Sequence, residues 1–330
     1  MSRRPMLAAG LALLITPALC AQDAPIASDV ETTFETRSVD IGSLTSGAGA
    51  PGPGLLAEVF RVAVREEAPT ATVQVGPKDD ELIVFADAAS QARIEEMVGT
   101  MAALPPGKRV VPAMVYVDAR RTRDGIGRYF FDREIAQVMG HLGANWLERP
   151  SREKEERTSL LIELLGVEAD TDVADIGAGT GYFTFPIARK AEDGTVYAVD
   201  IQPEMLEFIE ARKRHESIEN VTGVLGTITD TALPANSIDL AFAVDAYHEF
   251  SNPLEMLQSI RRALRPGGRL VLVEFRLEDP DVPIKRLHKM SQAQARRELE
   301  ANGFEWVRTD DRLPRQHVLV FRKTKLPQVD

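Results

Sequence analysis

The residues with the clearest chemical pattern lie at positions 173–184, where an acidic side chain precedes three glycines at alternating positions. Asp175 ends a short apolar run, and the turn that follows contains Gly177, Gly179 and Gly181. Glycine allows backbone conformations that other residues avoid, and it lets a ligand lie directly against the chain. Dinucleotide-binding turns space their glycines as G-x-G-x-x-G, and here Tyr182 takes the last of those positions. The pattern predicts a ligand-binding turn between a strand and a helix, and it disfavours a dehydrogenase.

Two more acidic residues end apolar segments further along the chain. Asp200 ends the segment 195–200, and Asp245 ends the segment 237–245. Asp200 follows Asp175 by about 25 residues, close to the spacing at which an acidic residue binds a ribose diol in a βαβ nucleotide fold. Ligands of open α/β sheets bind at the carboxyl ends of the strands. We therefore expect the three aspartates to lie at one edge of a parallel sheet.

An ordered set of motifs resembles the class I S-adenosylmethionine-dependent methyltransferases over residues 135–323. The set comprises the glycine turn, the segments that end in Asp200 and Asp245, and residues 263–275, where a helix end and a Gly-Gly stop precede a strand. Two later segments are similar to an exported bacterial branch of this family with unknown substrate, namely 283–291 and 311–317. The resemblance implies S-adenosyl-L-methionine as cofactor. It also implies an α/β fold with a Rossmann-like, seven-stranded, mostly parallel sheet and helices on both faces.

The resemblance also assigns roles in cofactor binding. The glycines would admit the methionine part of the cofactor, Asp200 would accept hydrogen bonds from the ribose hydroxyls, and Asp175 would order the loop. Thr227 stands where many relatives carry an acidic residue facing the adenine, so adenine recognition would rest on main-chain groups and Ile201. The predicted cofactor-binding set is Asp175, Gly177, Gly179, Gly181, Asp200, Ile201, Thr227 and Asp245.

Catalysis of methyl transfer requires alignment of the reactants and exclusion of water, because the donor is already activated. A base is needed only where the acceptor must lose a proton. His248, which ends the run Asp245-Ala-Tyr-His, is the candidate base because its ordinary pKa lies near neutrality. Asp245 is the second catalytic candidate. The alternative is that His248 packs or hydrogen-bonds at a helix start. Candidates for the acceptor pocket are Tyr182, Tyr247 and His288.

The segments 134–146 and 151–165 are predicted to be helices that form a lid ahead of the sheet. His141 and Trp146 fall in the first of them, and Trp146 is expected in the core. The chain has 5 histidines and no close carboxylate or thiol grouping at ligand spacing, which predicts no metal site.

Composition restricts the partners and the compartment. The net charge of -11 and the lack of a long basic run disfavour a nucleic-acid substrate. Residues 1–21 resemble an export signal, with Arg3 and Arg4 before a short apolar run, which predicts an exported, periplasmic protein without a stable transmembrane anchor. A twin-arginine route, a general secretory route and retention in the cytoplasm stay open. Cleavage after Ala21 would remove Cys20, the only cysteine.

The rest of the chain divides into short parts. Residues 22–54 are predicted to be a disordered linker. Residues 105–134 are predicted to be a connecting segment, and residues 324–330 a tail. Residues 55–104 are predicted to form a small α+β module, weakly similar to periplasmic domains of secretins, with a role in packing or in binding a protein partner. Its expected elements are strands at 58–64, 72–75 and 81–85 and a helix at 89–103.

The leading hypothesis is an enzyme that transfers a methyl group to a small-molecule or lipid-like acceptor. The alternative is a non-catalytic exported protein that keeps the fold and binds S-adenosylmethionine or S-adenosylhomocysteine.

Overall fold

The structure is a computed structural model that describes residues 33–46, 50–65, 68–78, 80–105 and 115–324. The predicted export signal at 1–21 lies outside these residues. Among the helices that are described, none is both long enough and apolar enough to span a bilayer.

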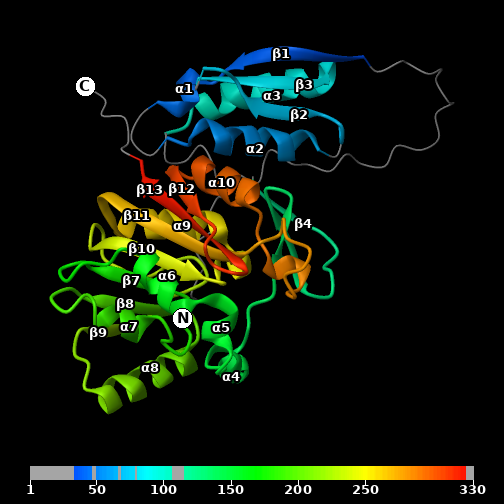
Figure 1. The fold of residues 1–330 in the computed structure, drawn as a ribbon. Helices are drawn as coiled ribbons and strands as arrows, with labels where there is room; N and C mark the ends of the chain where they lie inside the picture. The colour runs from blue at the N-terminus through cyan, green and yellow to red at the C-terminus, as the bar shows by residue number, and fades with distance from the viewer. Residues whose placement is uncertain (1–32, 47–49, 66–67, 79, 106–114, 325–330) are drawn as a thin grey trace, which may run out of the picture. The chain divides into compact units, whose positions relative to one another are not determined.

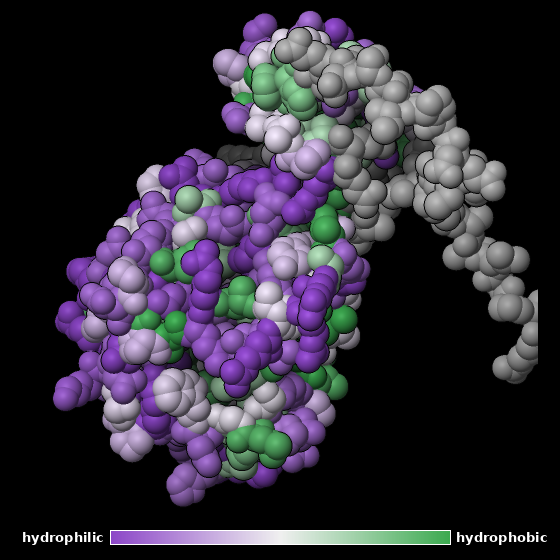
Figure 2. All heavy atoms as spheres, turned by 90° about the vertical axis from the view of Figure 1, so that its right-hand side faces the viewer, coloured by the Kyte–Doolittle hydropathy of each residue, from purple (hydrophilic) through white to green (hydrophobic). Residues whose placement is uncertain are grey.

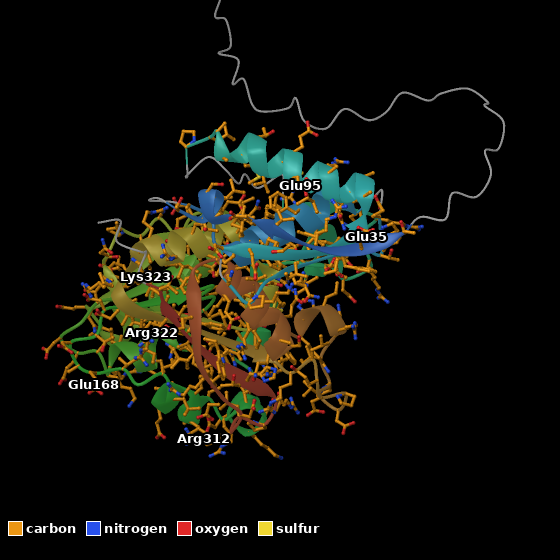
Figure 3. All side chains as sticks on the ribbon, turned by 90° about the horizontal axis from the view of Figure 1, so that it is seen from above. Glu35, Glu95, Glu168, Arg312, Arg322 and Lys323 are labelled. Atoms are coloured by element: carbon orange, nitrogen blue, oxygen red, sulfur yellow. The ribbon has the colours of Figure 1, made fainter. Side chains whose placement is uncertain are left out.

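A seven-stranded sheet forms the centre of the methyltransferase-like part (Figure 1). Six strands run parallel, and β13 runs antiparallel to both of its neighbours. This arrangement confirms the predicted fold class. In Figure 3, Arg312 marks the turn before β13, and Lys323 marks its end. In sheet order the strands are β12 (Phe304–Asp310), β13 (Gln316–Lys323), β11 (Leu264–Phe275), β10 (Ile238–Val244), β7 (Val173–Ile176), β8 (Val196–Asp200) and β9 (Val221–Leu225).

Hydrophobic cores cover both faces of this sheet, because successive residues of a strand point to opposite sides. On β10, Leu240 and Phe242 belong to one core, whereas Ala241 and Ala243 belong to the other. The first core is covered by α6 (Thr158–Leu164), α7 (Thr184–Ala188) and α8 (Pro203–Glu216). The second is covered by α9 (Pro253–Ala263) and α10 (Gln292–Ala301).

The N-terminal module is an antiparallel sheet in the order β1-β3-β2, with three helices. The predicted strand at 58–64 is wrong, because these residues belong to α2. The buried residues Leu56, Val59, Phe60 and Val64 recur at helical spacing. The elements are β1 (Phe34–Asp40), α1 (Gly42–Thr45), α2 (Pro53–Val64), β2 (Thr72–Val75), β3 (Glu81–Asp87) and α3 (Ala88–Ala102).

The module begins earlier than predicted. Residues 34–40 and 42–45 form β1 and α1, although 22–54 was expected to be a disordered linker. Pro53 and Gly54 open α2, because proline suits the first helical turn, where its missing N–H has no partner to lose. Gly and Pro at this point therefore start a helix instead of continuing a linker.

One face of the module packs on the same chain. Glu58, buried on α2, forms ion pairs with Arg61 and with Arg297 of α10, the latter at 3.0 Å. Arg61 also pairs with Asp132 at 2.7 Å, and Leu254 joins the hydrophobic core of the module. This face of α2 is thus occupied by the chain itself.

The segment ahead of the main sheet differs from the predicted pair of helices. Residues 133–136 form β6 in a small sheet with β4 (Tyr116–Asp118) and β5 (Gly125–Phe130). The 3-10 helix η3 (His141–Gly143) and α4 (Ala144–Leu147) follow. The predicted helix at 151–165 is split into α5 (Arg152–Glu156) and α6, because Arg157 has φ 53. The predicted strand at 109–117 is described only from residue 115, and 116–117 belong to β4.

On the face drawn in Figure 2, hydrophilic residues predominate and hydrophobic residues are scattered. Trp146, which was expected in the core, is 51% exposed and carries the guanidinium of Arg149 at 3.9 Å from its ring.

Candidate functional site

The glycine turn adopts backbone conformations that side chains would obstruct. Gly177, Gly179 and Gly181 have φ +77, +54 and +80, in the left-handed region that glycine favours. A Cβ on Gly177 would lie 2.9 Å from Cβ of Ala246, and one on Gly179 would lie 2.7 Å from a methyl carbon of Leu147. The turn therefore brings bare backbone to the carboxyl end of β7.

Asp200 ties this turn to the end of β8. Its carboxylate accepts hydrogen bonds from the backbone N–H groups of Gly179 and Gln202, both at 2.9 Å. The side chain is buried, and this burial raises its pKa. Two N–H donors leave further lone pairs on the two oxygens, which can accept from a ligand.

A cavity opens at these strand ends, and both sequence-predicted and unpredicted residues line it. The predicted ones are Gly177, Gly179, Asp200, Ile201 and Thr227. The lining is largely apolar, and its two acidic side chains belong to Asp200 and Glu249. The lining residues that the sequence did not suggest include Val138, Met139, Leu147, Gln202, Met205, Ile228, Ala246, Glu249, Phe250, Ser251 and Met256.

Residues 138–141 are held at the cavity by side chains from two strand ends. The amide of Gln202 donates to the carbonyl of Met139 at 3.0 Å and accepts from the N–H of His141 at 2.7 Å. Glu249 accepts from the N–H of Met139 at 3.1 Å. The lid predicted for this region is thus an irregular segment anchored by hydrogen bonds, and Val138 and Met139 line the cavity.

Asp175 and Gly181 lie outside the cavity lining. Asp175 is buried and accepts a hydrogen bond from the hydroxyl of Thr184 in α7 at 2.7 Å. Burial raises its pKa to about 7, and the negative charge of Asp200 adds to this shift. The aspartate joins the end of β7 to the helix after the turn, in keeping with a loop-ordering role.

Asp245 also lies outside the lining residues. It has φ 51, an uncommon conformation for a residue other than glycine. One carboxylate oxygen accepts from Gln316 at 2.8 Å, and the other is buried with no hydrogen-bond partner in the described part of the chain. Burial and the charges of Glu156 and Glu274 raise its pKa well above the ordinary value. Its predicted roles in cofactor binding and catalysis stay predictions.

His248 is fixed between a carboxylate and a second histidine. It lies in the short helix η4 (Tyr247–Glu249) and is 2% exposed. Its Nδ1 is 2.6 Å from Oε2 of Glu274, and its Nε2 is 3.1 Å from Nδ1 of His288 in η5 (Arg286–His288). The ring is not part of the cavity lining, whereas the adjacent Glu249 is.

The two tyrosines proposed for an acceptor pocket lie elsewhere. Tyr247 is completely buried and donates to Glu298 at 2.7 Å, which leaves no surface for a ligand. Tyr182 has its hydroxyl 3.1 Å from that of Thr158, and its ring lies under Arg152. Neither lines the cavity.

The tertiary structure brings together a group of possible metal ligands that the sequence did not suggest. In the described part of the chain, ligand atoms of His248, Glu249 and His288 all lie within 4.8 Å of one another. His288 lies 40 residues from His248 in the sequence, so no motif of local spacing predicts this cluster.

The fold and the site define a Rossmann-like α/β domain with a cavity at the carboxyl ends of β7, β8 and β10. Residues 168–313 match the family model described as "Methyltransferase domain". This part of the chain is a domain of the class I S-adenosylmethionine-dependent methyltransferase family.

Individual relatives agree with that assignment. The chain is 40% identical over 113 residues to a demethylmenaquinone methyltransferase of Tropheryma whipplei (strain Twist), across 34% of this chain and 45% of the relative. It is 36% identical over 142 residues to an uncharacterized methyltransferase of Mycobacterium tuberculosis (strain ATCC 25618 / H37Rv), across 43% and 53%. The chain thus spans about half the length of the curated relatives it matches.

A solved structure shares the fold. The crystal structure of a SAM-dependent methyltransferase from Aquifex aeolicus aligns with TM-score 0.54 at 22% identity. The alignment covers 57% of this chain and 100% of the other.

Proposed function

We propose that this protein transfers a methyl group from S-adenosyl-L-methionine to a small-molecule or lipid-like acceptor. The observation that carries the proposal is the cavity in which the glycine turn and the buried carboxylate of Asp200 meet. The free lone pairs of Asp200 would accept hydrogen bonds from the two ribose hydroxyls. The bare backbone at Gly177 and Gly179 would lie against the methionine part. Thr227 and Ile228, which also line the cavity, would flank the adenine.

The lining supports catalysis by alignment and by exclusion of water. Methyl transfer from a sulfonium centre is an in-line displacement, so holding the acceptor in line supplies most of the advantage. Val138, Met139 and Leu147 present apolar surface from the segment ahead of the sheet. The hydrogen bonds of Gln202 and Glu249 hold that segment in place and would keep water from the reacting centre.

An apolar acceptor fits this lining best. The proteins that resemble this chain include one named for demethylmenaquinone, a lipid-like molecule. That name, together with the apolar wall of the cavity, supports a small or lipid-like acceptor for this protein. The net charge of -11 also argues against a nucleic acid.

A proton acceptor for the reaction is available close to the cavity. His248 is oriented by Glu274 in the manner of a carboxylate–histidine pair, because its Nδ1 contacts that carboxylate. It would serve only where the acceptor loses a proton. Glu249 stands between this pair and the cavity.

The cofactor assignment is tested by calorimetry on purified protein with S-adenosylmethionine, S-adenosylhomocysteine and NAD. We expect the first two to bind at one site per chain and NAD to give no heat. Binding of NAD alone would overturn the assignment.

The acceptor is tested by release of S-adenosylhomocysteine with a lipid extract in micelles and with an aqueous metabolite extract. Turnover with either extract supports a methyltransferase, and the lipid extract is expected to give the higher rate. Cofactor binding with no turnover in either extract would favour the non-catalytic alternative.

A further inference from the structure

The groups that surround His248 resemble the support of a metal ligand. Its Nδ1 is 2.6 Å from the carboxylate of Glu274, which is itself fully buried. A histidine that binds a metal commonly gives its second ring N–H to a carboxylate, which fixes the ring and raises its basicity. This contact directs Nε2 of His248 toward His288 and Glu249.

The three candidate ligand atoms have the spacing of a coordination site. Nε2 of His248 is 3.1 Å from Nδ1 of His288 and 3.8 Å from Oε1 of Glu249, and the last two atoms are 3.5 Å apart. In the plane of this triangle, one point is about 2.0 Å from all three atoms. Zinc–nitrogen and zinc–carboxylate bonds in proteins have lengths of about 2.0–2.2 Å. The three distances are therefore compatible with a single ion bound by all three atoms.

Three cationic side chains near this cluster have partners of their own. Lys285 pairs with Asp124 at 2.6 Å, and Lys289 donates to the carbonyl of Asp279 at 3.1 Å. The guanidinium of Arg133 pairs with Glu298 at 2.8 Å, although it also donates to the main-chain carbonyl of His248. The side chain of His288 is 24% exposed, which gives an ion a path from solvent.

We propose that His248, Glu249 and His288 bind one divalent cation of the Zn²⁺ class beside the cofactor cavity. Two histidines and one glutamate form a ligand set that zinc uses at catalytic sites, where three protein ligands leave a position for water or substrate. Glu249 joins the two sites, because it also lines the cavity. On the proposed function, the open position would take an oxygen or nitrogen atom of the methyl acceptor. Nε2 of His248 would then bind the ion and would not serve as the base of the reaction.

The test is metal binding to the full chain after removal of bound ions by a chelator. Co²⁺ is titrated and followed by its visible absorption, and Zn²⁺ affinity is measured by competition with a chromogenic chelator. The variants are His288→Ala and Glu249→Gln, and the matched control is His215→Ala, an exposed histidine on α8. Thermal unfolding of each protein checks that the fold persists.

We expect the wild type and His215→Ala to bind one equivalent of metal, and the other two variants to bind at least about tenfold more weakly. Weak or absent binding by the wild type would overturn the site, as would unchanged affinity in His288→Ala. Calorimetry with S-adenosylmethionine in the same samples keeps the outcomes separate. Cofactor binding without metal binding rejects the metal site alone, and metal binding without cofactor binding rejects the proposed function alone.

Discussion

At the scale of the residue, Asp200 has two tasks at one position. It fixes the glycine turn through the N–H of Gly179, and it also lines the cavity. A carboxylate that accepts from backbone N–H groups is held in place before a ligand arrives, so a ligand loses less entropy on binding. The two backbone N–H groups that donate to this carboxylate also replace the water that it loses when it is buried.

Asp200→Ala should weaken binding of S-adenosylmethionine by about 2–3 kcal/mol, because a pair of charge-assisted hydrogen bonds is lost. Calorimetry measures the change. Asp170→Ala is the control, since this exposed aspartate precedes β7 at the opposite end of the sheet. Thermal unfolding separates loss of a ribose contact from collapse of the turn. Affinity equal to the wild type in a folded Asp200→Ala protein would refute the ribose role.

Asp175 makes the stability of the protein depend on pH. In the folded state its pKa is about 7, against an ordinary value of 3.8, mainly because the side chain is buried. Between these values the folded chain holds a proton that the unfolded chain has released. The free energy of unfolding therefore falls as the pH rises from about 4 to about 7.

Asp175→Asn should flatten that fall, because the amide has no proton to lose and its oxygen can still accept from Thr184. Denaturant unfolding at several pH values between 4 and 8 measures the slope for both proteins. Equal slopes would mean that Asp175 titrates in the folded protein as it does in water.

At the scale of the element, the turn after β7 and residues 138–141 enclose the cavity from two sides. The turn depends on positive φ values, whereas residues 138–141 depend on side chains of Gln202 and Glu249. Residues 177–181 lie between β7 and α7, and residues 138–140 belong to no helix or strand. Single substitutions in them should therefore change ligand binding more than they change the fold.

Gly179→Val should abolish cofactor binding, because a branched side chain would occupy the space of the ligand. The positive φ and the 2.7 Å approach to Leu147 should also cost about 1–3 kcal/mol of stability. The control is Gly99→Val, since a Cβ at Gly99 in α3 meets no atom within 4 Å. Calorimetry and thermal unfolding are measured together. Undiminished binding in a folded Gly179→Val protein would place the cofactor away from this turn.

At the scale of the whole molecule, a buried carboxylate of the N-terminal module pairs with a partly exposed arginine of the methyltransferase domain. Glu58 is 2% exposed and bonds to Arg61 of its own helix and to Arg297 of the domain. Removal of one partner of a buried ion pair leaves an uncompensated charge, so this contact resists separation.

We propose that the protein is exported, on the strength of the basic and apolar pattern of residues 1–21.

The export route is tested by changing Arg3 and Arg4 together to lysine, which keeps the charge. If the twin-arginine route is used, the double variant should stay inside the cell; a general secretory signal should tolerate the change. Fractionation of a tagged protein measures the outcome. Recovery of both proteins only from the cytoplasm would refute export.

The sequence alone was enough to predict the central sheet and its ligand edge. Alternating strand and helix patterns of period 2 and 3.6 are local, as are a Gly-rich turn and a helix start such as Ser291, whose hydroxyl accepts from the N–H of Gln294. Asp200 ends β8 as expected, whereas Asp175 is the last residue but one of β7 and Asp245 directly follows β10. The pattern was misinterpreted at 58–64, where the buried residues have helical spacing, and at 134–146, where residues 133–136 pair with β5 as a strand.

Only the tertiary structure decided which side chains meet at the site. Gln202, Met139 and Glu249 are separated by many residues, and no pattern in the chain joins them before folding. The same holds for His248, Glu274 and His288, which η4, β11 and η5 bring within hydrogen-bond distance. Hydrophobic periodicity and motif spacing describe residues that are close along the chain. A site depends instead on contacts across strands and loops. Such contacts are set by the packing of the whole domain.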